Sequence, residues 1–256
     1  MNIFQKIATS LCLVAFALTA TAEDTPWYQV EVLVFANEDP SVLDDEFWPQ
    51  GLDVNHQRNA IKLRPPLHSS NSTFDAYELL PTSSLLFNDE KKRIARYHSY
   101  RVLYHAGWLQ PVEKQKKARP IHIRAGQILD NGMYELEGYI TVDRGRYLHF
   151  KPDLYHSRKL SSSESNLLRD FLNAGDQPLT SGTINPQSTS SLATEDSSTS
   201  TVTPLSTSFL TVPEFLTINM KQGRRMRSEE VHYLDHPLMG VLVLMLPVKT
   251  TGNANR

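Results

Sequence analysis

The stretch MYELEGYITVDRGRYLHF, residues 133–150, decides the fold class because polar and apolar side chains alternate along it. This period of two predicts a strand with one buried face: Tyr134, Leu136, Ile140 and Val142 on one side, and Glu135, Glu137, Tyr139 and Thr141 on the other. Asp143–Arg146 predicts a tight turn in which Gly145 can adopt a positive φ, and residues 147–150 return. The stretch therefore predicts an antiparallel β-hairpin.

Similar strand patterns recur along the chain, at residues 27–35, 100–108, 120–126 and 215–220. The first strand, WYQVEVLVF, and the last, GVLVLMLP at 240–247, are so apolar that each fits a central position in one sheet. Two helices are predicted between the strands. One runs over Ser83–His98 with Leu86, Ile94 and Tyr97 in its apolar stripe, and the other lies near Ser163–Asn173 with Ser163 as its cap.

These elements predict an α+β fold with a mainly antiparallel β-sheet and one or two helices. A single domain is expected to run from residue 23 to 160 and to be completed by strands within 209–256. Residues 37–80 are expected to be irregular but partly packed. Residues 161–208 are predicted to form a flexible Ser/Thr-rich insertion, because about two thirds of positions 188–208 are Ser or Thr.

Residues 1–22 predict a cleaved signal peptide, with Lys6 as the only charge, an apolar run over Ile7–Leu18 and a small-residue exit at Ala22. The protein is therefore expected to be periplasmic. Cys12, the only cysteine, lies inside that run, so the mature chain is predicted to have no lipid anchor, disulfide or thiol nucleophile. The net charge of −2 does not favour nucleic acid, and no later apolar run is long enough for a membrane span.

The pattern His232-x-x-Asp235-His236 suggests two possibilities. The first is a zinc-dependent envelope hydrolase, in which both histidines on one helical turn would bind the metal. Pro237 disfavours that helix, because a proline pushes the preceding residue out of the α region. The second possibility, which we prefer, is a hairpin bend in which Asp235 accepts backbone N–H groups, with ligand binding beside it. No catalytic residue, metal or cofactor is predicted.

Arginines cluster at two predicted turns, and each cluster could bind carboxylates through planar guanidinium groups: Arg144 and Arg146 in one, and Arg224, Arg225 and Arg227 in the other. If both turns lie at one edge of the sheet, the arginines form a single anion-binding surface. The alternative is a solvated strand end. Trp108 could stack on a sugar face, and its alternative position is the core.

Four segments carry a family resemblance: WYQVEVLVF, YRVLYHAGWLQP, EGYITVDRGRYLHFKPDL and RRMRSEEVHYLDHPLMGVLV. In this order they resemble the CsiV family of periplasmic peptidoglycan-binding proteins. The resemblance implies a non-enzymatic accessory protein of cell-wall assembly with a role in cell shape. It also implies partnership with an outer-membrane lipoprotein that activates a penicillin-binding protein. A third reading is a structural adaptor whose true ligand is another protein.

Overall fold

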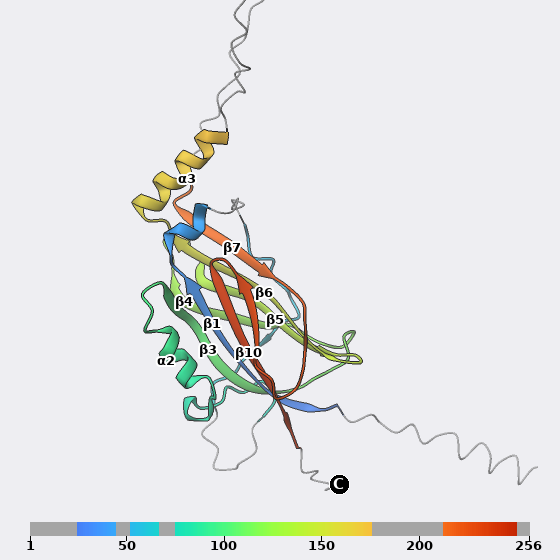
Figure 1. The fold of residues 1–256 in the computed structure, drawn as a ribbon. Helices are drawn as coiled ribbons and strands as arrows, with labels where there is room; N and C mark the ends of the chain where they lie inside the picture. The colour runs from blue at the N-terminus through green and yellow to red at the C-terminus, as the bar shows by residue number, and fades with distance from the viewer. Residues whose placement is uncertain (1–24, 45–51, 67–74, 176–211, 250–256) are drawn as a thin grey trace, which may run out of the picture.

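The computed structural model describes residues 25–44, 52–66, 75–175 and 212–249. Within these ranges two β-sheets face each other, and two α-helices lie at their periphery (Figure 1). The predicted α+β class with mainly antiparallel strands is therefore confirmed. The predicted signal peptide, Cys12 and residues 176–208 of the predicted insertion lie outside the described residues.

The first sheet has four strands in the order β3-β1-β10-β9, all antiparallel. These strands are β3 (Tyr100–Pro111), β1 (Trp27–Asn37), β10 (Met239–Val248) and β9 (His232–His236). The first and last strands of the chain lie side by side at the centre, where Val32 is opposite Val243. Both residues are fully buried. The predicted central position of these two strands is confirmed.

The second sheet contains the hairpin predicted from residues 133–150. Its order is β2-β4-β5-β6-β7, and β8 also pairs with β6. The strands are β2 (Ile61–Lys62), β4 (Ile121–Ile128), β5 (Tyr134–Arg144), β6 (Leu148–Lys159), β7 (Phe215–Lys221) and β8 (Arg224–Met226). Among the described strand pairs of this sheet, isolated bridges aside, only β2 and β4 pair in parallel.

The turn of this hairpin differs from the prediction in two respects. Arg144 and Leu148 form its last pair, so residues 145–147 make the turn and Tyr147 does not belong to the returning strand. The φ of Gly145 is not positive. A three-residue connection, in which the Gly145 N–H donates to the carbonyl of Tyr147 at 3.0 Å, spreads the reversal over more residues than a two-residue turn does.

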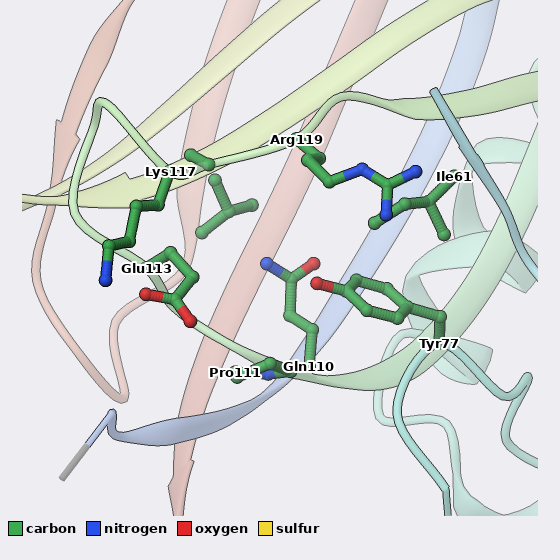
Figure 2. Close-up of a pocket in the computed structure, with 9 residues that line it drawn as sticks. Ile61, Tyr77, Gln110, Pro111, Glu113, Lys117 and Arg119 are labelled. Atoms are coloured by element: carbon green, nitrogen blue, oxygen red, sulfur yellow. The ribbon is translucent and has the colours of Figure 1, made fainter. Parts of the chain in front are cut away.

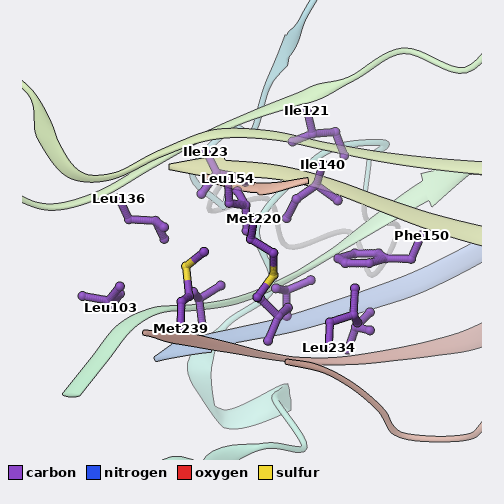
Figure 3. Close-up of a cluster of buried hydrophobic side chains, with 14 of the residues drawn as sticks. Leu103, Ile121, Ile123, Leu136, Ile140, Phe150, Leu154, Met220, Leu234 and Met239 are labelled. Atoms are coloured by element: carbon purple, nitrogen blue, oxygen red, sulfur yellow. The ribbon is translucent and has the colours of Figure 1, made fainter. Parts of the chain in front are cut away.

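The core lies between the two sheets (Figure 3). Leu136 and Ile140 from β5 and Met220 from β7 meet Leu234 and Met239 of the first sheet, and all five are at most 2% exposed. Each buried side chain of this size stabilises the fold by about 1.5–3 kcal/mol. The apolar faces that the alternating pattern predicted in both sheets therefore pack against each other in one core.

Helix α2 (Asn88–Ile94) is much shorter than the predicted helix over Ser83–His98. Glu31, a buried residue on the outer face of β1, accepts hydrogen bonds from the backbone N–H groups of Leu86 (2.8 Å) and Phe87 (2.7 Å). These bonds fix the backbone just before the helix, which therefore begins at Asn88. Phe87 packs against Leu33 and Leu244 of the first sheet. Leu86, predicted to be part of the apolar stripe, is instead 54% exposed.

Helix α3 (Ser162–Gly175) confirms the helix predicted near Ser163–Asn173, but its cap is Ser161. The Ser161 hydroxyl accepts from the Glu164 N–H at 3.3 Å, and Glu164 Oε2 accepts from the Ser161 N–H at 2.8 Å. These reciprocal bonds form a capping box. Arg158 donates to the same carboxylate through both terminal nitrogens, at 2.9 and 2.6 Å.

The predicted irregular segment 37–80 is partly packed in its described portions. It contains β2 and the 3-10 helix η2 (Pro40–Asp44), and a second 3-10 helix, η3 (Thr82–Ser84), follows it. Leu43 and Leu80 are buried. No helix in the described ranges has the length and apolar character that crossing a membrane requires.

Candidate functional site

The pairing of β8 with β6 brings the two arginine clusters together. Arg225 lies opposite His149 and Arg224 opposite Phe150, two and three residues beyond the β5–β6 turn that carries Arg146. In Figure 1 this turn projects away from α3. The surfaces predicted separately from the sequence therefore lie at one end of the second sheet.

Tyr147 is the centre of this surface. The Cζ atom of Arg225 lies 4.3 Å from the centroid of its ring, and that of Arg146 lies 5.5 Å away. The ring is 42% exposed. Each such cation–π contact at an exposed site contributes about 0.5–1 kcal/mol. A guanidinium stacked in this way keeps its in-plane N–H groups available for a carboxylate.

Arg144 and Arg227 are less available to an external anion, because other groups of the protein contact them. Nε of Arg144 donates to the carbonyl of Val112 at 3.0 Å, which fastens the chain segment after β3 to the hairpin. Arg227 is exposed, but its Nη1 lies 3.8 Å from Glu230 Oε2, which partly offsets its charge. The arginines best placed for an external anion are therefore Arg146, Arg224 and Arg225.

A basic loop that was missed in the sequence adjoins the hairpin. The N–H of Arg144 donates to the carbonyl of Glu113 at 2.9 Å, and Lys114 forms a β-bridge with Arg144. The loop carries four exposed cations within six residues: Lys114, Lys116, Lys117 and Arg119. That density is the signal that could have identified it. We call the β5–β6 turn, Arg224, Arg225 and residues 113–119 the basic end.

The buried carboxylate beside the basic end does not neutralise its arginines. Asp143, at 1% exposure, accepts a 2.6 Å hydrogen bond from Lys151 Nζ. Nδ1 of His149 lies 3.2 Å from the other carboxylate oxygen. Because the charge of Asp143 is matched by Lys151, the exposed arginines leave a net positive field at this end of the molecule.

The predicted hairpin is formed by β9 and β10, and its geometry does not suit a shared metal. His232 and His236 lie at the two ends of strand β9 rather than on one turn of a helix. Four residues along a strand span about 13 Å. Among the described residues, no group of three or more His, Cys, Asp and Glu side chains could hold a metal ion. The disfavoured zinc arrangement therefore has no geometric support.

The side chains of His232, Asp235 and His236 form hydrogen bonds with groups close to them in the chain. His232 Nε2 accepts from the N–H of Arg227 at 3.1 Å, and His236 Nδ1 accepts from the N–H of Leu238 at 3.2 Å. Asp235 accepts from the hydroxyl of Tyr233 at 2.6 Å, which corrects the prediction that it accepts backbone N–H groups. The turn comprises only residues 237–238, so Asp235 still lies within a strand.

Trp108 lies in the core, and the stacking role considered for it is not supported. Its side chain is 0% exposed, and its indole Nε1 donates to Gln110 Oε1 at 2.7 Å. A ring without an exposed face cannot stack on a sugar. The burial of Trp108 follows from its position on the inner row of β3, opposite Val30 of β1.

A pocket of about 170 Å³ opens beside the basic end, between the loop 113–119, β2 and the end of β3 (Figure 2). Tyr77, Gln110 and Arg119 gather on one side of it, and Glu113 and Lys117 lie on the other. Burial is the main reason that the pKa of Tyr77 is raised, while the nearby Arg119 acts in the opposite direction. The pocket thus combines both signs of charge with a neutral phenol and an amide.

A family model described as peptidoglycan-binding protein, CsiV, matches residues 6–248, nearly the whole chain. No curated protein and no solved structure matches the chain. The matched range includes the first sheet, the second sheet and the basic end. The chain belongs to the CsiV family.

Proposed function

We propose that this protein binds peptidoglycan in the periplasm through its basic end, as a non-catalytic accessory protein of cell-wall assembly. The observation that carries the proposal is the stacking of Arg146 and Arg225 on the exposed ring of Tyr147. Family membership supports the same ligand, because the family is described as peptidoglycan-binding.

The chemistry of the ligand fits this surface. Peptidoglycan presents carboxylates on its stem peptides at a regular spacing, and planar guanidinium groups bind carboxylates through two parallel hydrogen bonds. The stacking on Tyr147 holds Arg146 and Arg225 in a preferred orientation before the ligand arrives. Less side-chain entropy is then lost on binding.

The test is sedimentation of the purified mature protein with isolated sacculi. Replacing Arg146, Arg224 and Arg225 with alanine should weaken pelleting about tenfold or more, because each lost charge-assisted contact is worth about 1.5–3 kcal/mol when fully formed. The matched control replaces three exposed cations of α2, Lys91, Lys92 and Arg93, and makes the same change of net charge. Equal pelleting of both variants would refute the proposed surface.

A protein-binding function is a second candidate, favoured by exposed aromatic side chains on the outer face of the first sheet. Tyr233 stacks on Phe35 with ring centroids 6.3 Å apart, and Phe35 meets the edge of Tyr100 at 5.6 Å. Tyr97 extends the row from Tyr100 at 6.2 Å. Exposed aromatic groups of this kind are enriched at protein interfaces.

The partner proposed for this face is the outer-membrane lipoprotein that activates a penicillin-binding protein, which would connect wall binding with cell shape. Replacing Tyr97 and Tyr233 with serine should abolish cross-linking to that purified lipoprotein and leave sedimentation with sacculi unchanged. Cross-linking at the original level would exclude this face as the contact surface.

A further inference from the structure

The pocket beside the basic end contains opposite charges that the described part of the chain does not pair with each other. Among the residues that the structure describes, the side chains of Glu113 and Lys117 make no hydrogen bond or ion pair. Arg119 is held by one bond, from Nε to the carbonyl of Asn59 at 3.1 Å, and its two terminal nitrogens are unused within the same part of the chain. A carboxylate and two cations are therefore left for a ligand.

We propose that this pocket binds the ammonium and carboxylate groups at the free end of a diamino dicarboxylic acid in an uncross-linked stem peptide. Glu113 receives the ammonium group, and Lys117 and Arg119 receive the carboxylate. The inference rests on the proposed function and specifies which part of peptidoglycan is read. The basic end alone would bind any anion, whereas a pocket with both signs of charge selects a zwitterion.

The uncharged lining limits how the ligand can lie. Gln110 and the hydroxyl of Tyr77 supply neutral hydrogen-bonding groups, and Ile61 and Val142 supply apolar contacts. The backbone of Tyr77 has a φ of 63°, which is uncommon for a residue with a side chain. Its N–H donates to the carbonyl of Leu109 at 2.7 Å, and this bond fixes the strained position that places the phenol at the pocket.

The size of the pocket selects an end group rather than a complete repeat unit. Its volume of about 170 Å³ is below the roughly 300–1,000 Å³ that pockets for drug-sized ligands occupy. A disaccharide peptide does not fit, but the terminal amino and carboxyl groups of one side chain do. The rest of the ligand must lie outside the pocket.

The position of the pocket connects this end group with the arginines. The side chain of Glu113 lines the pocket, and its carbonyl accepts from the N–H of Arg144, the last residue of β5 before the β5–β6 turn. A stem peptide whose end lies in the pocket can thus extend along the loop towards Arg146. Its other carboxylates then face the guanidinium groups on Tyr147.

The experiment titrates the full mature protein with a disaccharide tetrapeptide that contains a diaminopimelate residue with a free amine. The comparison ligand is the same muropeptide with that amine acetylated, and binding is measured by calorimetry. The wild type should bind the free-amine form about tenfold more tightly, because acetylation removes one charge-assisted contact. Glu113→Gln should bind both forms with equal affinity, at the level of the acetylated ligand.

Three results would overturn the inference. They are equal affinity of the wild type for both muropeptides, unchanged discrimination in Glu113→Gln, and free diaminopimelate binding as tightly as the muropeptide. Glu113→Gln keeps the backbone carbonyl that receives the Arg144 N–H, and a circular dichroism melt verifies its fold. Sedimentation with sacculi, run in parallel, separates the two proposals. If Arg146, Arg224 and Arg225 are needed for pelleting while Glu113→Gln discriminates normally, only the pocket assignment fails.

Discussion

Replacing Glu164 with glutamine should destabilise the protein by an amount that depends on pH. Burial by itself would raise the pKa of Glu164, but hydrogen bonds from Arg158 and Ser161 outweigh burial and lower it from 4.5 to about 2. Glutamine has nearly the same shape and can still accept from the Ser161 N–H in the capping box. The substitution therefore removes mainly the charge that pairs with Arg158.

The magnitude follows from the lowered pKa of this carboxyl group. A change from 4.5 to about 2 corresponds to roughly 3 kcal/mol of preference for the ionised form. Solvent screening around the partly exposed Arg158 reduces this figure, so we expect a loss of about 2 kcal/mol near neutral pH. For a chain of this length, that loss should lower the Tm by about 4–8 °C.

The sign of the pH dependence is fixed because the folded-state pKa lies below the unfolded one. The stabilisation is complete above pH 4.5 and is lost as the pH falls towards about 2, where Glu164 is protonated in both states. Urea unfolding of wild type and Glu164→Gln should therefore show a difference in unfolding free energy that shrinks in acid. The control is Glu90→Gln, which breaks an exposed pair with Arg93 and should cost about 0.5 kcal/mol or less.

Two outcomes would refute this reasoning. A loss near neutral pH no larger than that of Glu90→Gln would mean that the Arg158 contact adds nothing to stability. A loss that stays constant down to about pH 3 would mean that the effect comes from packing rather than from charge.

Three further predictions concern the first sheet. Glu31→Ala should lower the unfolding free energy by about 3 kcal/mol in urea, because it leaves the backbone N–H groups at the start of α2 without their acceptor; an unchanged midpoint would contradict this. Gly240→Ala should cost about 1–3 kcal/mol in the same assay, since its methyl group would overlap the ring of Phe35. Excess zinc should leave the Tm unchanged, and a rise abolished by replacing His232 and His236 with alanine would contradict the assignment of these residues to local structure.

The strands were predictable from the sequence because their period of two survives in the folded sheets. The apolar row of Leu136, Ile140 and Val142 is the inner row of β5, and the apolar first and last strands are central. The extent of α2 was not predictable. It depends on Glu31, a residue more than fifty positions away whose carboxylate binds the backbone before the helix.

The site was predictable only in part. The sequence identified the arginine clusters, but their meeting depends on the pairing of Arg225 with His149 across separate segments, which no local pattern encodes. The pocket with Glu113 was missed for the same reason. The burial of Trp108 was not predictable from the alternating pattern. Alternation assigns a residue to one of the two faces of a strand, but it does not tell which face is the core.

The central pairing of β1 with β10 has a consequence for the synthesis of the protein. Val32 and Val243 are neighbours in the sheet, although more than two hundred residues separate them. Closing a loop of that length costs about 5 kcal/mol of chain entropy, which only the completed strand pair offsets. The first strand therefore has no neighbour on this side until the ribosome has made β10. A copy that ends before β10 therefore lacks one of the two central strands of this sheet, and β1 keeps an unpaired edge.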